Sequence, residues 1–126
     1  MLTWLRNKLS GDTTLPAVIF IDIGYDCYQL CEALTQQKIA QPIAFIDEEP
    51  WSHLTKMQGA KLHYPNEILA LSKKHPVQVV IKFTGLGWEP DPPTVGNLAK
   101  LKVHLLTLDP QNTLEQQLTA LRAVLN

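Results

Sequence analysis

The chain has 126 residues, of which 45% are apolar and 18% charged, so it suits one folded domain and excludes a disordered tail. Its 11 Lys and Arg against 12 Asp and Glu leave a formal charge of −1, which argues against a nucleic-acid partner held mainly by electrostatic attraction. The apolar runs are much shorter than the roughly 18 residues of a spanning helix, so we expect no stable membrane insertion. No signal peptide is expected either, and two cysteines do not make a disulfide framework, which favours a cytoplasmic location.

Residues 1–11 are predicted to form a short amphipathic N-terminal helix. Leu2, Leu5 and Leu9 recur at helical spacing, and Gly11 ends the pattern. Docking on protein, either this domain or a partner, is the favoured role, and weak contact with a membrane surface is the alternative. No linker or repeat divides the remaining chain, so residues 12–126 are predicted to be a single domain.

Five apolar segments are predicted to be strands, and helical patterns separate them. The strands are expected at Ala17–Ile21, Pro42–Ile46, Lys61–Tyr64, Val77–Phe83 and Val103–Leu108. The helices are indicated by the stripe of Cys27, Leu30, Cys31 and Leu34, by Asn66 as the N-cap of the next helix, by Val95–Leu101, and by Thr113 with Gln116 as a capping box. Strands that alternate with helices predict an α/β fold, a doubly wound and mainly parallel five-stranded sheet with helices on both faces.

In such sheets a ligand binds beyond the carboxyl ends of the strands, where the strand order reverses. The segments expected at that edge are Asp22–Cys27, the acidic corner Asp47–Glu49, and Thr84–Pro93. The sequence therefore places its candidate site residues in three loops.

Two of these segments carry a resemblance. Val18–Leu34, followed by Ile43–Pro50, resembles the nucleotide-binding entry unit of nucleotide-sugar dehydratases and epimerases of polysaccharide biosynthesis, and the similarity extends over residues 17–83. The resemblance implies a Rossmann-like domain over residues 12–126. It also implies a nucleotide-type small molecule as ligand, with NAD(P) or another nucleotide as the candidate cofactor.

The glycine motif of that family is degenerate in this chain. Asp22, Gly24 and Cys27 stand where the family has three glycines, so only the middle one is kept. Asp22 adds an anion where two phosphates would lie. The alternative, which we favour, is that Asp22 and Asp26 cap the N-terminus of the following helix.

Asp47 is the second candidate for ligand binding. It follows the second predicted strand, where the resemblance implies an acid that accepts hydrogen bonds from ribose hydroxyls. The alternative is a solvated acidic turn that Pro50 ends.

The loop after the fourth predicted strand supplies the remaining candidates. Thr84, Gly85 and Gly87 could cradle a phosphate, and Trp88 could stack on a base or sugar ring. A stiff surface loop with a packed tryptophan is the more common outcome. A protein-contact patch that includes Leu86 is a further alternative.

No catalytic or metal-binding constellation is evident. Cys27 and Cys31 lack further ligands at metal spacing and are expected in the core, and the four histidines form no recognisable triad. The family's catalytic Tyr-x-x-x-Lys pair is absent as well. The sequence thus favours a non-catalytic module that binds or senses a nucleotide or nucleotide-sugar. The alternative is a ligand-free domain that contacts a protein partner or forms a homodimer, and a small enzyme with Asp22 or Asp47 as base is a weaker third hypothesis.

Overall fold

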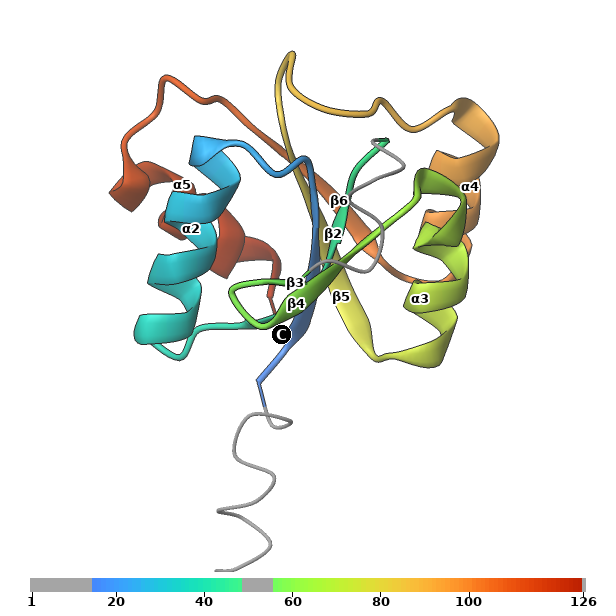
Figure 1. The fold of residues 1–126 in the computed structure, drawn as a ribbon, viewed down its shortest axis with the longest axis horizontal. Coiled ribbons are helices and arrows are strands. Elements are labelled where there is room, and N and C mark those ends of the chain that lie inside the picture. The colour runs from blue at the N-terminus through green and yellow to red at the C-terminus, as the bar shows by residue number, and fades with distance from the viewer. Residues whose placement is uncertain (1–14, 49–55, 126) are drawn as a thin grey trace, which may run out of the picture.

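A six-stranded sheet forms the centre of the computed structural model, which describes residues 15–48 and 56–125 (Figure 1). The strands are β1 (Ala17–Ile21), β2 (Gln41–Ile46), β3 (Lys56–Met57), β4 (Ala60–His63), β5 (Val77–Phe83) and β6 (His104–Leu108), in the order β3-β4-β2-β1-β5-β6. Five of them run parallel, and β3 is a short antiparallel addition at the edge beside β4. The predicted helix over residues 1–11 lies outside the described residues.

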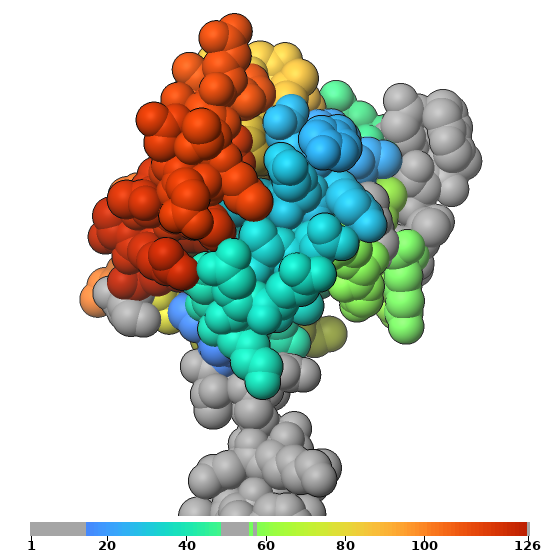
Figure 2. Space-filling view, turned by 90° about the vertical axis from the view of Figure 1, so that its left-hand side faces the viewer, coloured from blue at the N-terminus to red at the C-terminus, as the bar shows by residue number. Residues whose placement is uncertain are grey.

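Helices cover both faces of the sheet. They are α2 (Tyr25–Gln36), the 3₁₀ helix η3 (Pro65–Glu67), α3 (Ile68–Lys74), α4 (Pro92–Lys100) and α5 (Leu114–Val124). The helices α2 and α5 lie on one face and α3 and α4 on the other (Figure 1), and Figure 2 shows α2 beside α5 on the outside of the molecule. The predicted fold class is therefore confirmed. None of the described helices is long and apolar enough to span a membrane.

The order of the parallel strands creates a switch point between β1 and β5. The strand β1 pairs with β2 on one side and with β5 on the other. The chain leaves β1 through α2 on one face of the sheet and returns to β5 through α3 on the opposite face (Figure 1). The carboxyl ends of β1 and β5 therefore form the position at which open α/β sheets bind ligands.

Burial explains why β1 is apolar without alternation. Val18 and Phe20 belong to the cluster beneath α2 and α5, whereas Ile19 and Ile21 belong to the cluster beneath α3 and α4. All four side chains have 0% exposure. Because neighbouring side chains on a strand point to opposite faces, a strand covered on both sides must be apolar at every position.

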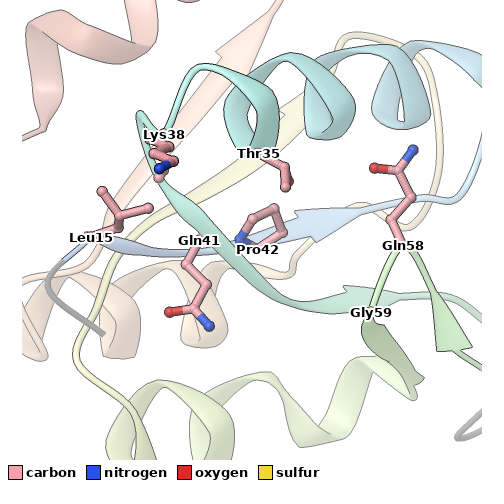
Figure 3. Close-up of a pocket in the computed structure, with 8 residues that line it drawn as sticks. Leu15, Thr35, Lys38, Gln41, Pro42, Gln58 and Gly59 are labelled. Atoms are coloured by element: carbon pink, nitrogen blue, oxygen red, sulfur yellow. The ribbon is translucent and has the colours of Figure 1, made fainter. Parts of the chain in front are cut away.

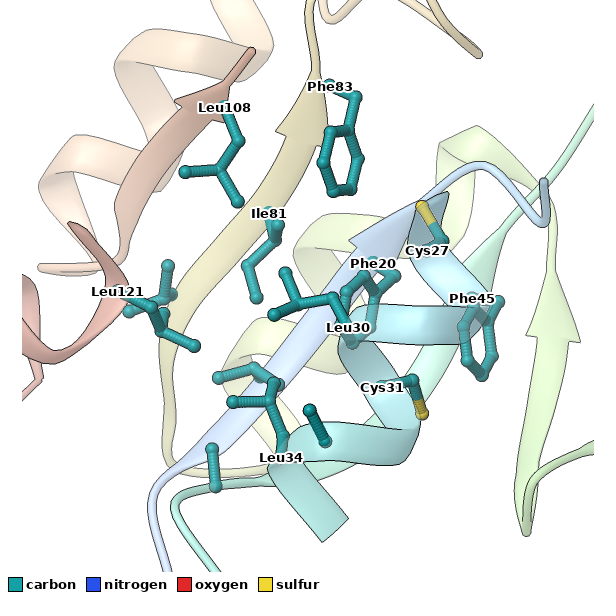
Figure 4. Packing of buried hydrophobic residues seen from close by; sticks show 14 of the residues in the cluster. Phe20, Cys27, Leu30, Cys31, Leu34, Phe45, Ile81, Phe83, Leu108 and Leu121 are labelled. Atoms are coloured by element: carbon teal, nitrogen blue, oxygen red, sulfur yellow. The ribbon is translucent and has the colours of Figure 1, made fainter. Parts of the chain in front are cut away.

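The cluster beneath α2 and α5 is built around two stacked rings. The centroids of Phe20 and Phe45 lie 5.4 Å apart. Leu30 of α2, Leu121 of α5 and Ile81 of β5 belong to the same cluster as these two rings (Figure 4). The cluster thus joins β1, β2 and β5, and two of these strands, β1 and β5, form the switch point.

One predicted helix start is wrong. Asn66 lies inside the 3₁₀ turn Pro65–Glu67 and is exposed, and α3 begins only at Ile68. The Glu67 carboxylate accepts a hydrogen bond from the backbone N–H of Tyr64 at 2.6 Å. This bond pairs the backbone N–H directly before the 3₁₀ turn, so the helical segment begins without a side-chain cap from Asn66.

The ends of the last two helices follow ordinary capping chemistry. The helix α4 begins earlier than the predicted Val95, because the Asp91 carboxylate accepts a hydrogen bond from Thr94 N–H at 2.9 Å. The predicted capping box of α5 is confirmed. Thr113 Oγ1 accepts from Gln116 N–H at 3.1 Å, and Gln116 Oε1 accepts from Thr113 N–H at 2.9 Å.

Both cysteines are buried on the inner face of α2, as predicted (Figure 4). The Cys27 thiol donates a hydrogen bond to the Ile21 carbonyl at 3.4 Å. Burial raises the pKa of the Cys27 thiol far above its ordinary value and raises the pKa of Cys31 to about 11.

We predict that neither thiol reacts with Ellman's reagent at pH 8 while the protein is folded. A thiol of pKa about 11 is deprotonated in about one molecule in a thousand at that pH, and burial denies the reagent access. The labelling rate should rise with guanidinium in parallel with unfolding, measured by circular dichroism. Rapid stoichiometric labelling of either cysteine in native protein would contradict the described packing.

Candidate functional site

Three of the predicted segments meet at the carboxyl edge of the sheet. Asp22 directly follows β1, Asp47 follows β2 and Thr84 follows β5. The backbone continues to pair beyond the strands, since Asp22 N–H donates to the Ile46 carbonyl at 2.8 Å. The ends of β2, β1 and β5 are thus consecutive along this edge.

Asp22 has the backbone conformation of a glycine. Its φ is +95°, a region that residues with a Cβ rarely adopt. It occupies the position of the first glycine in the motif of the resembled family. The turn therefore keeps the shape that the motif requires, although the side chain introduces strain.

The Asp22 carboxylate binds the one glycine that the motif retains. Its Oδ2 accepts a hydrogen bond from Gly24 N–H at 3.1 Å. Gly24 is the N-cap of α2, with φ of −73° and no side-chain capping bond to the helix. The expectation that Asp22 caps the first turn of the helix is thus wrong in detail, because its carboxylate binds the residue that precedes that turn. Asp26 lies within the first turn.

Gly87 packs directly against Asp22. A methyl group at Gly87 would lie 2.7 Å from Asp22 Cβ, closer than two non-bonded carbon atoms approach. The φ of Gly87 is +75°. Gly85 has a similar φ of +77° but has no atom within 4 Å of the same position. The second glycine of the loop therefore brings the β5 loop against the β1 turn.

The rest of the loop is fastened to the domain. Leu86 packs against the cluster beneath α2 and α5, and Trp88 packs against the cluster beneath α3 and α4. Thr84 N–H and its hydroxyl both donate to the Leu108 carbonyl, at 2.9 and 3.3 Å. Half-buried Trp88 favours the stiff-loop alternative over an exposed protein-contact patch.

Asp47 presents an acceptor that the described residues leave without a donor. Its backbone N–H donates to the His63 carbonyl at 2.9 Å, which holds it beside the end of β4. Its Oδ2 is buried and has no hydrogen-bond partner within residues 15–48 and 56–125. Buried acceptors in proteins are nearly always paired, so this oxygen suits a hydroxyl donor from a ligand.

Sequence reasoning missed Lys82. This residue interrupts the apolar run of β5 one position before its end, and its side chain is only 3% exposed. Its Nζ lies 3.0 Å from Glu89 Oε1 and donates to the Phe83 carbonyl at 3.3 Å. A single lysine within an apolar strand was the available signal.

Three cavities of the described part lie away from this edge. One of 240 Å³ is bounded by Gln41 and Pro42 at the start of β2 and by Thr35 and Lys38 near the end of α2 (Figure 3). Another, of 280 Å³, lies between α3 and α4, and the third, of 210 Å³, is also lined by Gln41. None of the three is lined by Asp22, Asp47 or the residues that directly follow β5, and the third lies at the amino ends of β1 and β5, beside Ala17 and Pro76. Within the described residues, no group of three or more His, Cys, Asp or Glu side chains is arranged to hold a metal ion.

We predict that Gly87→Ala destabilises the fold more than Gly85→Ala. Both variants carry the cost of a Cβ at positive φ, about 1 kcal/mol, but only Gly87→Ala overpacks against Asp22, which adds about 1–3 kcal/mol. Chemical denaturation measures the difference. In an Asp22→Gly background the excess should vanish, because the clashing Cβ is gone. Equal costs for the two alanines would disprove the contact.

No family model and no curated protein sequence matches the chain. Among solved structures, it is similar to UDP-D-quinovosamine 4-dehydrogenase from Vibrio fischeri, with 30% identity and a TM-score of 0.62 over 83% of this chain and 84% of that one. It also resembles RSP, a Rex-family repressor, at 13% identity and a TM-score of 0.58. The repressor complex with β-NAD⁺ and operator DNA matches at a TM-score of 0.56 and 13% identity.

The coverage of these matches differs. This chain spans 63% of the repressor in one structure and 62% in the other, while the two matches cover 95% and 94% of this chain. At 13% identity the repressor shows the fold alone. The dehydrogenase structure is 30% identical and is matched over most of both chains. The chain therefore belongs to the family of Rossmann-like nucleotide-binding domains that resemble the N-terminal modules of nucleotide-sugar dehydratases and epimerases.

Proposed function

We propose that the chain binds a nucleotide-type ligand at the carboxyl edge of its sheet and acts as a non-catalytic binding or sensing module. The observation that carries this proposal is the buried Oδ2 of Asp47, which has no donor among the described residues. Asp47 directly follows β2, next to the switch strand β1, where a Rossmann fold places the acid that binds ribose hydroxyls. The 30% identity with UDP-D-quinovosamine 4-dehydrogenase, whose name denotes a nucleotide-sugar substrate, supports the same ligand class.

The energetics of Asp47 favour an external hydroxyl donor. Leaving a buried acceptor without its hydrogen bond costs about 1–3 kcal/mol, and a ligand hydroxyl that donates to Oδ2 would remove that cost. The neighbouring Glu48 is exposed and is already solvated. A ligand hydroxyl therefore gains more free energy by donating to Asp47 than by donating to Glu48.

The turn after β1 determines how such a ligand lies. Gly24 N–H is held by Asp22, and Gly87 packs over the same residue. A diphosphate at this turn would meet the Asp22 carboxylate at close range, where like charges repel. We infer that a ligand with phosphates either displaces Asp22 or places its phosphates elsewhere, and the first case would couple binding to movement of the β5 loop.

A protein-interaction or self-associating domain is the second candidate function. Two large side chains on the outer surface of α2 favour it, since Tyr25 is 73% exposed and Tyr28 is 42% exposed. They lie one turn apart on the helix and next to the turn that Asp22 closes. A stable homodimer that ignores nucleotides and dissociates on Tyr28→Ser would favour this candidate, whereas a monomer would oppose self-association.

We predict that a nucleotide raises the melting temperature of the wild-type protein and that Asp47→Ala reduces this shift. The panel is NAD⁺, NADP⁺, CoA, ATP and UDP-sugars, read by thermal unfolding. A ligand at a hundredfold excess over its Kd stabilises the fold by about 2.7 kcal/mol, and a tenfold loss of affinity in Asp47→Ala removes about 1.4 kcal/mol of that.

The matched control for this prediction is Glu48→Gln, which removes one charge at the neighbouring exposed position. It should leave the shift unchanged. Without ligand, Asp47→Ala should be no less stable than wild type, because it removes a buried acceptor that has no partner among the described residues. A panel with no shift, or equal shifts in the two variants, would count against the proposed site.

A further inference from the structure

Lys82 is a buried charge at the ligand-binding edge. Ile81 and Phe83 point into the cluster beneath α2 and α5, so the alternation of the strand directs Lys82 toward the opposite face. Its side chain is 3% exposed. Within the described part of the chain, its one ion-pair partner is Glu89.

The ion pair with Glu89 does not offset the free-energy cost of burying the Lys82 ammonium group. Removing an ammonium group from water costs several kcal/mol, and the attraction repays this cost only when both partners are buried and fully hydrogen-bonded. The Glu89 side chain is 76% exposed, so water screens its charge and competes for its oxygens. An apolar side chain at this position would serve packing equally well.

Lys82 lies where one ligand bound at Asp47 could reach it. Asp47 follows β2 and Lys82 nearly ends β5, and both strands flank β1. Neighbouring strands lie about 4.8 Å apart, so these two strand ends are separated by about 10 Å, the scale of a ribose and the phosphates attached to it. Between them, the Gly24 N–H is already bound by a carboxylate.

We propose that Lys82 is the phosphate-binding residue of this edge and that the Glu89 carboxylate holds the same ammonium group until a phosphate replaces it. The inference rests on the proposed function for the identity of the whole ligand, but its chemistry requires only a phosphate group. Glu89 lies on the loop that contains Gly85 and Gly87, both at positive φ. Exchange of one anion for another leaves the buried charge paired throughout and frees the Glu89 carboxylate, while Leu86 and Trp88 keep the loop packed on the domain.

The test is a titration with inorganic phosphate, followed by backbone amide NMR shifts and compared with chloride at equal ionic strength. We expect saturable shifts at residues 82–89 in the wild-type protein. Glu89→Gln should tighten phosphate binding at least threefold, because it removes the competing carboxylate, and Lys82→Met should abolish the shifts. Glu115→Gln removes one charge from the exposed surface of α5 and should behave as wild type.

Each other outcome overturns the inference. If phosphate causes no saturable shift in Glu89→Gln, or if Lys82→Met retains it, then Lys82 only anchors the loop. Shifts centred on Gly24 would assign the phosphate to the start of α2. Glu89→Gln carries this test even if Lys82→Met does not fold, because its substitution is on the surface.

The same experiment separates this inference from the proposed function. If adenosine or uridine binds through Asp47 but phosphate does not bind at Lys82, the proposed function stands and the phosphate site is rejected. Phosphate binding at Lys82 in a protein that binds neither nucleosides nor nucleotides would preserve the phosphate site and reject the proposed function.

Discussion

The complete burial of β1 is the constraint on which the rest of the structure depends. Four of its side chains have no exposure, and parallel partners occupy both of its edges. All five residues of β1 are apolar, so on this strand chemistry is confined to the residues that follow it. The first of these is Asp22, and it supplies both the strained turn and the carboxylate that binds Gly24 N–H.

Carboxylates of this chain occupy the places where an anionic ligand would be expected. Asp22 accepts from the amide at the start of α2, and Glu89 pairs with the buried ammonium of Lys82. Asp47 differs from both, because no donor within residues 15–48 and 56–125 reaches its buried oxygen. Under the two proposals made above, the ligand of this edge would bring a hydroxyl donor to Asp47 and an anion to Lys82.

Family membership and site chemistry are separate questions for this fold. The strand order, the glycine-like backbone at Asp22 and the 30% identity with a dehydrogenase structure all place the chain among Rossmann-like nucleotide-binding domains. The replacement of two motif glycines changes what the shared backbone presents to a ligand. Gly87 shows how the change is accommodated, since only a residue without a side chain can pack against Asp22.

The sequence by itself determined the five parallel strands, the helices between them and the three loops at the carboxyl edge, because hydrophobic period and capping residues are local signals. It placed the start of α3 wrongly at Asn66, since a hydrogen bond that the Tyr64 N–H donates to the Glu67 carboxylate replaced the expected cap. Only the tertiary structure decided that Asp22 meets Gly87, that Trp88 packs inward, and that Lys82 is buried beside Glu89. The contact of Asp22 with Gly87 joins two separate loops, and the burial of Trp88 and Lys82 depends on how the helices and strands pack around them, which no local pattern specifies.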